Sequence, residues 1–468
     1  ITKDDLKAPS SRTTSAVLAI RLAKSGPYAR TVCFTFGYGR HLLDPSRLER
    51  DFGLLLALNA VDPQRLRAFD ARRQDDVVVN SRVQASAGTD LTSFDLDEHR
   101  DIFRSAAGTT LSEHTELLGS MVRGSVGVTF DAPIDVGDLA ARARQLLRLY
   151  RKDFYRESFP FVDHVRPVDE PMAESLDNRL GDALRKLSEG KDTGFKCLYL
   201  AIPDVIDIEQ TEGFTFSSEY GNEPTVHSNL SLDFYLATRR GRASPTSIGR
   251  TKTDYVNRRV EGQVDYRLAT VYRCLVAEVD RAGKTYQLVD GSWYAVAAEF
   301  VARVRGEIAD IPLSPVAFPE LEPGEDEGDY NDRAAAHLGG ICLDARNVGI
   351  GGGRNRLEVC DIALQDRTLI FAKKRAASST LSHLWFQATV SMQALLSDGD
   401  YRVRVREKID DLDPAFAIIA QDGLEGRDFS VDYLVLGVDP DSPAAHLPFF
   451  SQVALWQAHR TLRSMAVP

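Results

Sequence analysis

A proline-rich and acidic stretch in the second half of the chain most limits how this sequence can fold. Residues 311–327 hold four prolines, and acidic side chains follow one another at their end. Proline lacks a backbone N–H and fixes φ, so a helix or a central strand cannot continue through such a stretch. The chain must therefore fold as separate parts. We predict an α+β domain at 1–200, a β-rich middle domain with a basic segment at 201–322, and an α/β domain at 323–468.

The charge balance limits the classes of partner. The 468 residues carry 57 Lys and Arg against 68 Asp and Glu, which gives a net charge of −11. That balance excludes a chain that is basic all over, such as a coat for nucleic acid. A local basic cleft remains open, because the positive side chains gather in a few places. They cluster at 142–152, 239–259, 354–356 and 373–375.

The cysteines and the hydropathy pattern bear on compartment. The five cysteines are spread over the chain, and no two of them stand at C-x-x-C spacing. An odd, scattered set predicts reduced thiols rather than disulfides or a zinc ribbon. No apolar run reaches the roughly 18 residues of a membrane span, and the polar N-terminus does not resemble a signal peptide. We therefore expect a cytoplasmic protein without a membrane partner.

Beyond the proline-rich stretch, the order of predicted elements is informative. Hydrophobic periodicity predicts helices and short strands in the succession α-β-β-β-α-β, followed by a further helix. The predicted helices cover 327–338, 378–396 and 451–465, and the predicted strands cover 340–345, 356–364, 367–374 and 430–438.

This succession resembles the core of the PD-(D/E)XK restriction-endonuclease-like superfamily. The superfamily pattern places an acid on the first helix, an Asp in the second strand and an acid-x-Lys triplet in the third. Glu327, Asp361 and Lys373 match these positions and are our candidate catalytic residues. The resemblance implies that Glu327 and Asp361 hold Mg²⁺, a hard cation that selects oxygen ligands. It also implies that Lys373 lies near the nucleophile and offsets negative charge.

The match departs from the superfamily pattern at one position. Phe371 stands where the triplet should carry an acid. Glu358 is a candidate substitute, but three residues separate it from Asp361, and on a continuous strand the two would face opposite sides. The departure leaves a binding-only module open. Open alternatives are a solvated helix start at Glu327 and a surface pair formed by Asp361 and Lys373.

Several cations and hydroxyls are candidates for contacts with nucleic acid. Ser378 or Ser379 can cap the helix that follows the third strand and leave N–H groups for a phosphate. A basic segment with an interleaved tyrosine, residues 239–259, can follow a phosphate backbone, although a solvated loop is the alternative. The full set of candidates is Lys374, Arg375, Ser378, Ser379, Arg354, Arg356, Arg239, Arg240 and Arg258.

A second resemblance covers nearly the whole chain. The segments that carry it include FTFGYGRHLL (34–43), DFGLLLALNAVDP (51–63), VYRCLVAEV (271–279), YNDRAA (330–335), KKRAASSTLSHL (373–384) and LPFFSQV (447–453). They are similar to those of an uncharacterised bacterial family described as a sporadically distributed protein. Its association with restriction-type defence islands implies a role in immunity to phage or foreign DNA. Other defence-system proteins are then expected partners.

Three classes of function follow. The first is a Mg²⁺-dependent endonuclease that cuts DNA or, as a lesser alternative, RNA. The second is a non-catalytic nucleic-acid sensor built on the same fold, which the absent acid at Phe371 favours. The third is a nucleotide-handling toxin built on the glycine-bearing segment 37–40. No G-x-S-x-G, H-E-x-x-H or Walker motif is present, which argues against serine hydrolases, zincins and P-loop NTPases.

Overall fold

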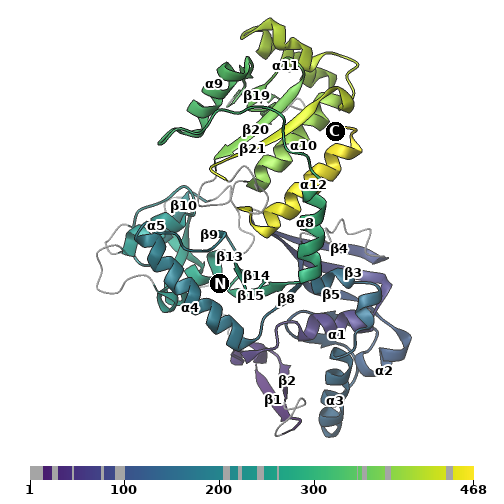
Figure 1. Ribbon diagram of the computed structural model, residues 1–468. Coiled ribbons are helices and arrows are strands. Elements are labelled where there is room, and N and C mark those ends of the chain that lie inside the picture. The colour runs from purple at the N-terminus through teal and green to yellow at the C-terminus, as the bar shows by residue number, and fades with distance from the viewer. Residues whose placement is uncertain are drawn as a thin grey trace, which may run out of the picture. The chain divides into compact units, whose positions relative to one another are not determined.

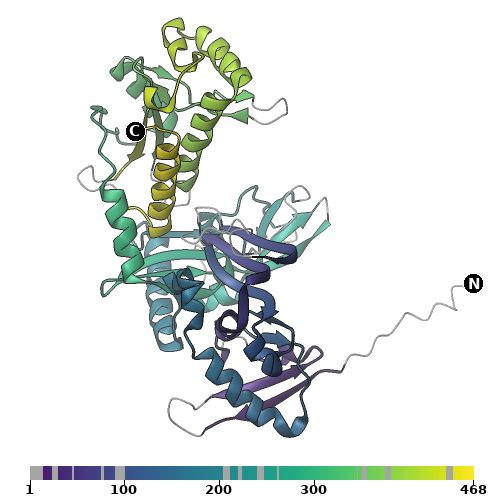
Figure 2. The ribbon, with the colours of Figure 1, turned by 90° about the vertical axis from the view of Figure 1, so that its right-hand side faces the viewer.

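The fold is a mixed α/β arrangement of several small sheets and their covering helices (Figures 1 and 2). The computed structural model describes residues 14–23, 30–44, 47–74, 78–89, 101–203, 211–219, 224–239, 247–260, 263–344, 346–349, 356–374, 381–438 and 446–468. The chain divides into two compact units, a first formed by 1–72 with 81–162 and a second formed by 73–80 with 163–468.

The first unit holds a two-stranded hairpin and a larger, five-stranded sheet. Its elements are β1 (Ala16–Arg21), β2 (Thr31–Phe36), α1 (Phe52–Ala60), β3 (Val61–Gln74), β4 (Val78–Thr89), β5 (Asp101–Thr110), α2 (Thr115–Leu118), β6 (Met121–Gly124), β7 (Val128–Phe130) and α3 (Leu139–Tyr150). The hairpin pairs β1 with β2. The sheet has the strand order β4-β3-β5-β6-β7.

Helix α1 is the centre of the first core. Its sequence is apolar all round, and such a helix is stable only where it is buried on every side. Two glycines allow that position, because a Cβ at Gly124 would lie 1.8 Å from the carbonyl oxygen of Gly53. The buried Asn59 amide donates to the carbonyl oxygens of Leu149 and Lys152, at 3.0 and 2.9 Å. This side chain ties α1 to the end of α3.

The second unit begins with two antiparallel sheets. Its first elements are β8 (Val165–Pro167), α4 (Glu170–Ser188), β9 (Cys197–Leu200), β10 (Gly213–Phe216), α5 (Leu232–Arg239), α6 (Ile248–Thr253), β11 (Tyr255–Val260), β12 (Gln263–Thr270), α7 (Val271–Cys274), β13 (Leu275–Arg281), β14 (Lys284–Val289), β15 (Ser292–Val296) and α8 (Ala298–Ala309). The larger sheet has the order β8-β15-β14-β13-β9, and the smaller has the order β10-β11-β12. The boundary predicted at residue 200 falls inside the larger sheet, because β8 and β9 form its two edges.

The C-terminal lobe, residues 327–464, contains the segments for which the sequence predicts a nuclease-like core. Its elements are α9 (Glu327–Leu338), β16 (Ile341–Cys342), β17 (Val348–Gly349), β18 (Arg356–Leu357), β19 (Ile362–Ala363), β20 (Thr368–Lys374), α10 (Leu381–Ser397), α11 (Gly399–Asp410), β21 (Ser430–Leu436) and α12 (Phe449–Ser464). The sheet order is β16-β19-β20-β21, antiparallel except for the parallel pair β20–β21. The described elements follow the predicted succession, with β17 and α11 added and with the strand predicted at 356–364 divided into β18 and β19.

Alternation along β20 explains the layers of this lobe. Ile370 packs in a cluster with Tyr330 and Ala334 of α9. Phe371, one residue on, packs in the larger cluster that holds α10 and α12. Successive side chains of a strand face opposite sides, so an apolar strand such as β20 needs a cover on both faces. Figure 1 shows α9 on one side of these strands, and Figure 2 shows α10 and α12 side by side.

Candidate metal centre

Three carboxylates meet at one end of the C-terminal sheet. Asp344 follows β16, and Asp361 immediately precedes the antiparallel neighbour β19. The backbone N–H of Leu343 donates to the carbonyl oxygen of Asp361 at 2.7 Å, so both acids lie at the same edge. Glu358 comes from the segment before Asp361. One ligand oxygen from each of the three side chains lies within 4.8 Å of the others.

Each carboxylate is held by a different structural layer. The Asn331 amide of α9 donates to Asp344 at 3.0 Å, and the Gln387 amide of α10 donates to Glu358 at 2.8 Å. The backbone N–H of Ala372 in β20 donates to Asp361 at 2.7 Å. The donors fix the carboxylate positions before any ligand is bound.

Asp361 is the most buried of the three acids. It is 5% exposed. Its pKa is raised from 3.8 to about 7, chiefly by burial; the Ala372 N–H lowers the pKa, and the neighbouring carboxylates of Glu358 and Asp344 raise it by smaller amounts. A bound cation would offset the repulsion between these neighbouring negative charges. The donors are all oxygen, which suits hard divalent cations, so these residues can hold a metal ion of that class.

Asn331 adds a further observation at the same place. Its side chain is fully buried, and its Nδ2 donates to Asp344. Its Oδ1 has no hydrogen-bond partner among the described residues. Buried polar atoms are almost always satisfied, so an orphaned amide oxygen beside an acidic cluster indicates a missing water or ion.

Glu327 is bound by cations at the end of β20 and stands outside the carboxylate cluster. The Lys373 ammonium donates to Glu327 Oε1 at 2.5 Å, and the Lys374 N–H donates to Glu327 Oε2 at 2.8 Å. Glu327 and Asp361 were predicted to bind metal together, but only Asp361 belongs to the cluster of three carboxylates. The Lys373 and Glu327 side chains are 33% and 27% exposed, so this pair contributes only about 1 kcal/mol or less.

The prediction that Glu358 and Asp361 face opposite sides of one strand is wrong, and the reason is local. Strand β18 ends at Leu357 and β19 begins at Ile362, so residues 358–361 are not strand and the alternation rule does not apply to them. Both acids converge as a result. Asp344 was not a candidate, although its position directly after the first strand of the lobe was a usable signal. Phe371 is fully buried in the core beneath α10.

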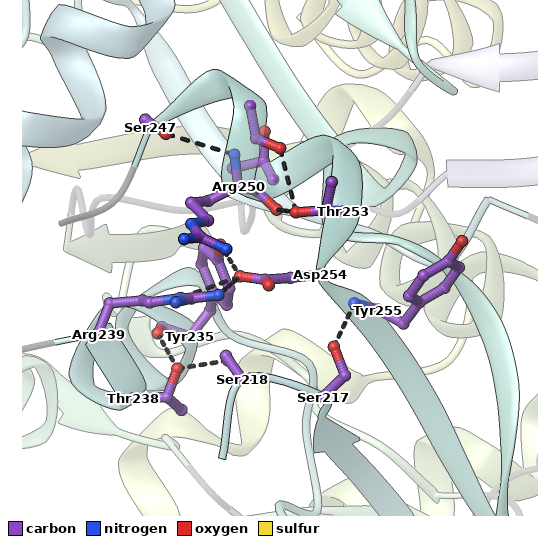
Figure 3. A network of polar contacts seen from close by, with 12 residues as sticks. Ser217, Ser218, Tyr235, Thr238, Arg239, Ser247, Arg250, Thr253, Asp254 and Tyr255 are labelled. Atoms are coloured by element: carbon purple, nitrogen blue, oxygen red, sulfur yellow. Dashed lines mark hydrogen bonds and ion pairs between the residues drawn. The ribbon is translucent and has the colours of Figure 1, made fainter. Parts of the chain in front are cut away.

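Arg239 lies inside the protein, in the network of Figure 3. It is 9% exposed, and its guanidinium forms an ion pair with Asp254. The Tyr235 hydroxyl donates to the same carboxylate at 2.7 Å. Arg239 thus holds α5 against the start of β11. A phosphate contact by this guanidinium would require breaking the buried pair.

The other predicted contact residues are spread over several places. Lys374 donates through Nζ to the carbonyl oxygen of Glu325 at 2.5 Å. Arg356 is exposed in β18, and Arg258 is half-buried in β11. Arg240, Arg354, Arg375, Ser378 and Ser379 lie outside the described residues.

The glycine-bearing segment at 37–40 has a packing explanation. Gly37 has a φ of +59°, in the left-handed region. A Cβ at Gly39 would lie 2.1 Å from the carbonyl oxygen of Ala16. Both glycines are therefore required where the chain turns back across the β1–β2 hairpin, and nothing in their geometry calls for a nucleotide.

Fold and site together define a mixed α/β multi-domain protein with a carboxylate cluster at a sheet edge. Comparison with known families gives a match over residues 1–468 to a family of unknown function, DUF6119, and the chain belongs to that family. No curated protein and no solved structure matches the chain. Among the described helices, none is both long and apolar enough to cross a bilayer.

Proposed function

We propose that the protein is a metal-dependent nuclease that hydrolyses phosphodiester bonds in DNA at the C-terminal lobe. The observation that carries the proposal is the convergence of Asp344, Glu358 and Asp361 within 4.8 Å. Lys373 at the end of β20 supplies a cation at the same sheet end. The succession of elements in the lobe supports a restriction-endonuclease-like core, and Mg²⁺ is the proposed ion.

The residues of the cluster fit such an ion. Carboxylates with all-oxygen donors suit Mg²⁺ or Mn²⁺. When bound, a divalent cation lowers the pKa of water and offsets charge on a scissile phosphate. The chain itself orients the ligands through Asn331, Gln387 and the Ala372 N–H. Such donors keep ligating carboxylates in place, and their loss commonly lowers metal affinity about 10–100-fold.

Glu358 takes the role that the acid-x-Lys triplet lacks at Phe371. It reaches the cluster from a segment outside the strand, so its position does not depend on strand alternation. Lys373 is the proposed group near the nucleophile. Its pair with Glu327 is about one-third exposed and weak, so a phosphate oxygen can replace the Glu327 carboxylate as its partner.

The biological setting of the proposal comes from the resemblance of the whole chain to a family of defence islands. In that setting the substrate is phage or other foreign DNA, with RNA as the alternative, and the protein acts in the cytoplasm. Other proteins of the same defence system are the proposed partners.

The direct test is cleavage by the purified full chain. Supercoiled plasmid, linear duplex and single-stranded DNA are incubated with Mg²⁺ or Mn²⁺, and with EDTA as the blank. We expect nicking or cutting with metal only. Asp361→Asn keeps an acceptor for the Ala372 N–H and removes a buried charge, so it should fold and yet abolish cleavage. Lys373→Ala should do the same.

Matched controls exist in the same lobe. Asp411 and Lys408 are exposed and belong to α11 or its end, so Asp411→Asn and Lys408→Ala change the same charges away from the cluster. Both controls should cut at the unaltered rate. Equal cutting by Asp361→Asn and by the unaltered protein would overturn the assignment of the site.

A second candidate function is a nucleic-acid sensor that does not cut. The pair of Lys373 with Glu327, in place of a contact between Lys373 and the cluster, favours it. Salt-dependent DNA binding that persists in EDTA, with no cleavage in any metal, would select this function over the first.

A further inference from the structure

One amide side chain interrupts the buried side of α9. The buried residues of this helix are Tyr330, Asn331, Ala334 and Ala335. Tyr330 and the two alanines pack in the core that also holds Ile370 of β20. Asn331 is 0% exposed. Asparagine is a poor helix former and is mostly found at the surface, so a fully buried asparagine on this side needs polar partners.

Only one end of the Asn331 side chain has a partner among the described residues. Its Nδ2 donates to an Asp344 carboxylate oxygen at 3.0 Å, and its Oδ1 accepts no hydrogen bond. A carboxylate accepts hydrogen bonds and donates none, so turning the amide round would set two acceptors against each other. The contact with Asp344 therefore fixes the amide oxygen beside the carboxylate cluster with its lone pairs unused.

The position of this oxygen suits a ligand of the same ion. The two polar atoms of one amide are about 2.2 Å apart, so Oδ1 lies within about 5 Å of the Asp344 oxygen that accepts from Nδ2. Oxygen ligands lie about 2.0–2.6 Å from Mg²⁺ or Ca²⁺, so two of them on opposite sides of one ion are about 4–5 Å apart. One cation can therefore contact both Asn331 and Asp344.

The charge of the cluster also favours an amide as the next ligand. Asp344, Glu358 and Asp361 together carry more negative charge, when ionised, than a divalent cation offsets. A further carboxylate would add a charge without a counter-charge. The side-chain oxygen of asparagine is a common ligand of hard cations and adds no charge.

We infer that Asn331 is a fourth protein ligand of the cation at this cluster, bound through Oδ1, while its Nδ2 holds Asp344. The helix α9 then supplies a ligand of its own, in addition to orienting a ligand from the sheet edge. The inference deepens the proposed function and rests on it for the presence of a cation.

The test uses Tb³⁺, a hard cation that binds oxygen ligands, with the full chain and no nucleic acid. Titration gives the affinity, and luminescence lifetimes in H₂O and D₂O give the number of water molecules on the bound ion. Asn331→Leu keeps the approximate shape of the side chain and removes the oxygen. We expect Asn331→Leu to weaken Tb³⁺ binding about tenfold or more and to add about one water to the bound ion.

A double-mutant cycle separates ligation by Asn331 from an action through Asp344. Asp344→Ala removes the group that Nδ2 holds. If Asn331 is a ligand, Asn331→Leu added to Asp344→Ala weakens binding further and adds another water; if Asn331 acts only through Asp344, it changes neither. Asn331→Asp added to Asp344→Ala keeps a ligand oxygen at 331 and should bind more tightly than the double variant with Leu.

Asn178 supplies the matched control, because it is an exposed asparagine in the helix α4. Asn178→Leu should bind Tb³⁺ with unaltered affinity and an unaltered number of waters. Thermal melting in EDTA establishes that each variant is folded before its affinity is compared.

The possible results separate this inference from the nuclease. Equal affinity and equal water number for Asp344→Ala with and without Asn331→Leu would overturn the inference, whether or not the protein cuts DNA. A protein that gives the expected cycle with Tb³⁺ and cuts no DNA in Mg²⁺ or Mn²⁺ would contradict the nuclease and leave Asn331 as a ligand. Absence of Tb³⁺ binding by the unaltered protein would overturn both.

Discussion

The stability of the second unit should depend on the protonation of Glu278. This residue lies in β13, is fully buried, and accepts the backbone N–H of Phe449 with both carboxylate oxygens, each at 2.8 Å. Phe449 is the first residue of α12, so Glu278 caps a helix that lies 171 positions further along the chain. The Nζ of Lys196 lies 4.0 Å from its Oε1.

The magnitude follows from the pKa of this carboxyl. Burial raises the pKa of Glu278 from 4.5 to about 7, because desolvation outweighs the attraction of Lys196 and the N–H of Phe449; Asp280 raises it and Arg305 lowers it by smaller amounts. A pKa raised in the folded state contributes stability that is present below 4.5 and is lost as pH rises through 7. A pKa difference of about 2.5, at about 1.4 kcal/mol for each pH unit, corresponds to about 3.5 kcal/mol over the whole range.

Glu278→Gln is the perturbation that isolates this effect. Glutamine keeps an oxygen acceptor for the Phe449 N–H and removes the charge. Relative to the unaltered protein, the variant should gain up to about 3 kcal/mol in free energy of unfolding between pH 5 and pH 8. Glu299 is an exposed carboxylate at the start of α8, and Glu299→Gln serves as the matched control, with no such gain.

The assay is urea denaturation at several pH values, monitored by far-UV circular dichroism and by tryptophan fluorescence. Trp293 and Trp456 are buried in the second unit and report its unfolding. A difference between Glu278→Gln and the unaltered protein that stays constant from pH 5 to pH 8 would refute the reasoning. A variant that loses stability relative to the unaltered protein as pH rises would show that the ionised form stabilises α12.

Three further predictions concern the site and the cores. Saturation with Mn²⁺ at one hundred times Kd should raise the free energy of unfolding by about 3 kcal/mol, and Asp344→Asn should abolish that shift in a thermal melt. Asp254→Asn leaves the buried Arg239 guanidinium without its carboxylate and should cost about 3–5 kcal/mol in urea denaturation; a loss below about 1 kcal/mol would contradict the buried pair. Phe371→Ala should destabilise the C-terminal lobe by about 3–5 kcal/mol in the same assay, because Phe371 is fully buried beneath α10; an unchanged midpoint would contradict that packing.

The pattern of apolar and polar residues along the chain was enough to predict several helices and strands of the C-terminal lobe. The strand that holds Lys373 and the helix that begins at Glu327 follow from hydrophobic periodicity and from a helix start in an acidic run. Asp361, which was predicted to lie in the second strand, immediately precedes β19. The two other acids of the cluster were harder to predict. Glu358 follows the end of β18, so the alternation of side chains along a strand does not determine which way it faces.

The type of a residue does not reveal whether its side chain is buried or which distant residue it contacts. Arg239 and Arg267 are both arginines near basic segments, and only the structure distinguishes the buried ion pair of one from the exposed stack of the other. The partner of Arg239 is 15 residues away, and the Tyr255 ring beneath Arg267 belongs to the neighbouring strand. Strand register, which fixes such neighbours, is set by the packing of both faces and cannot be taken from one strand alone.

The way in which the carboxylates are held has a consequence for the dynamics of the lobe. Asp344 depends on α9, Glu358 on α10 and Asp361 on β20, so local opening of any one of these elements removes one ligand from the set. An ion at the cluster would resist such opening in all three elements at once. Its presence should therefore slow amide hydrogen exchange in two helices and a strand that are separated in sequence. Through the cluster, three layers of the lobe would share one opening equilibrium.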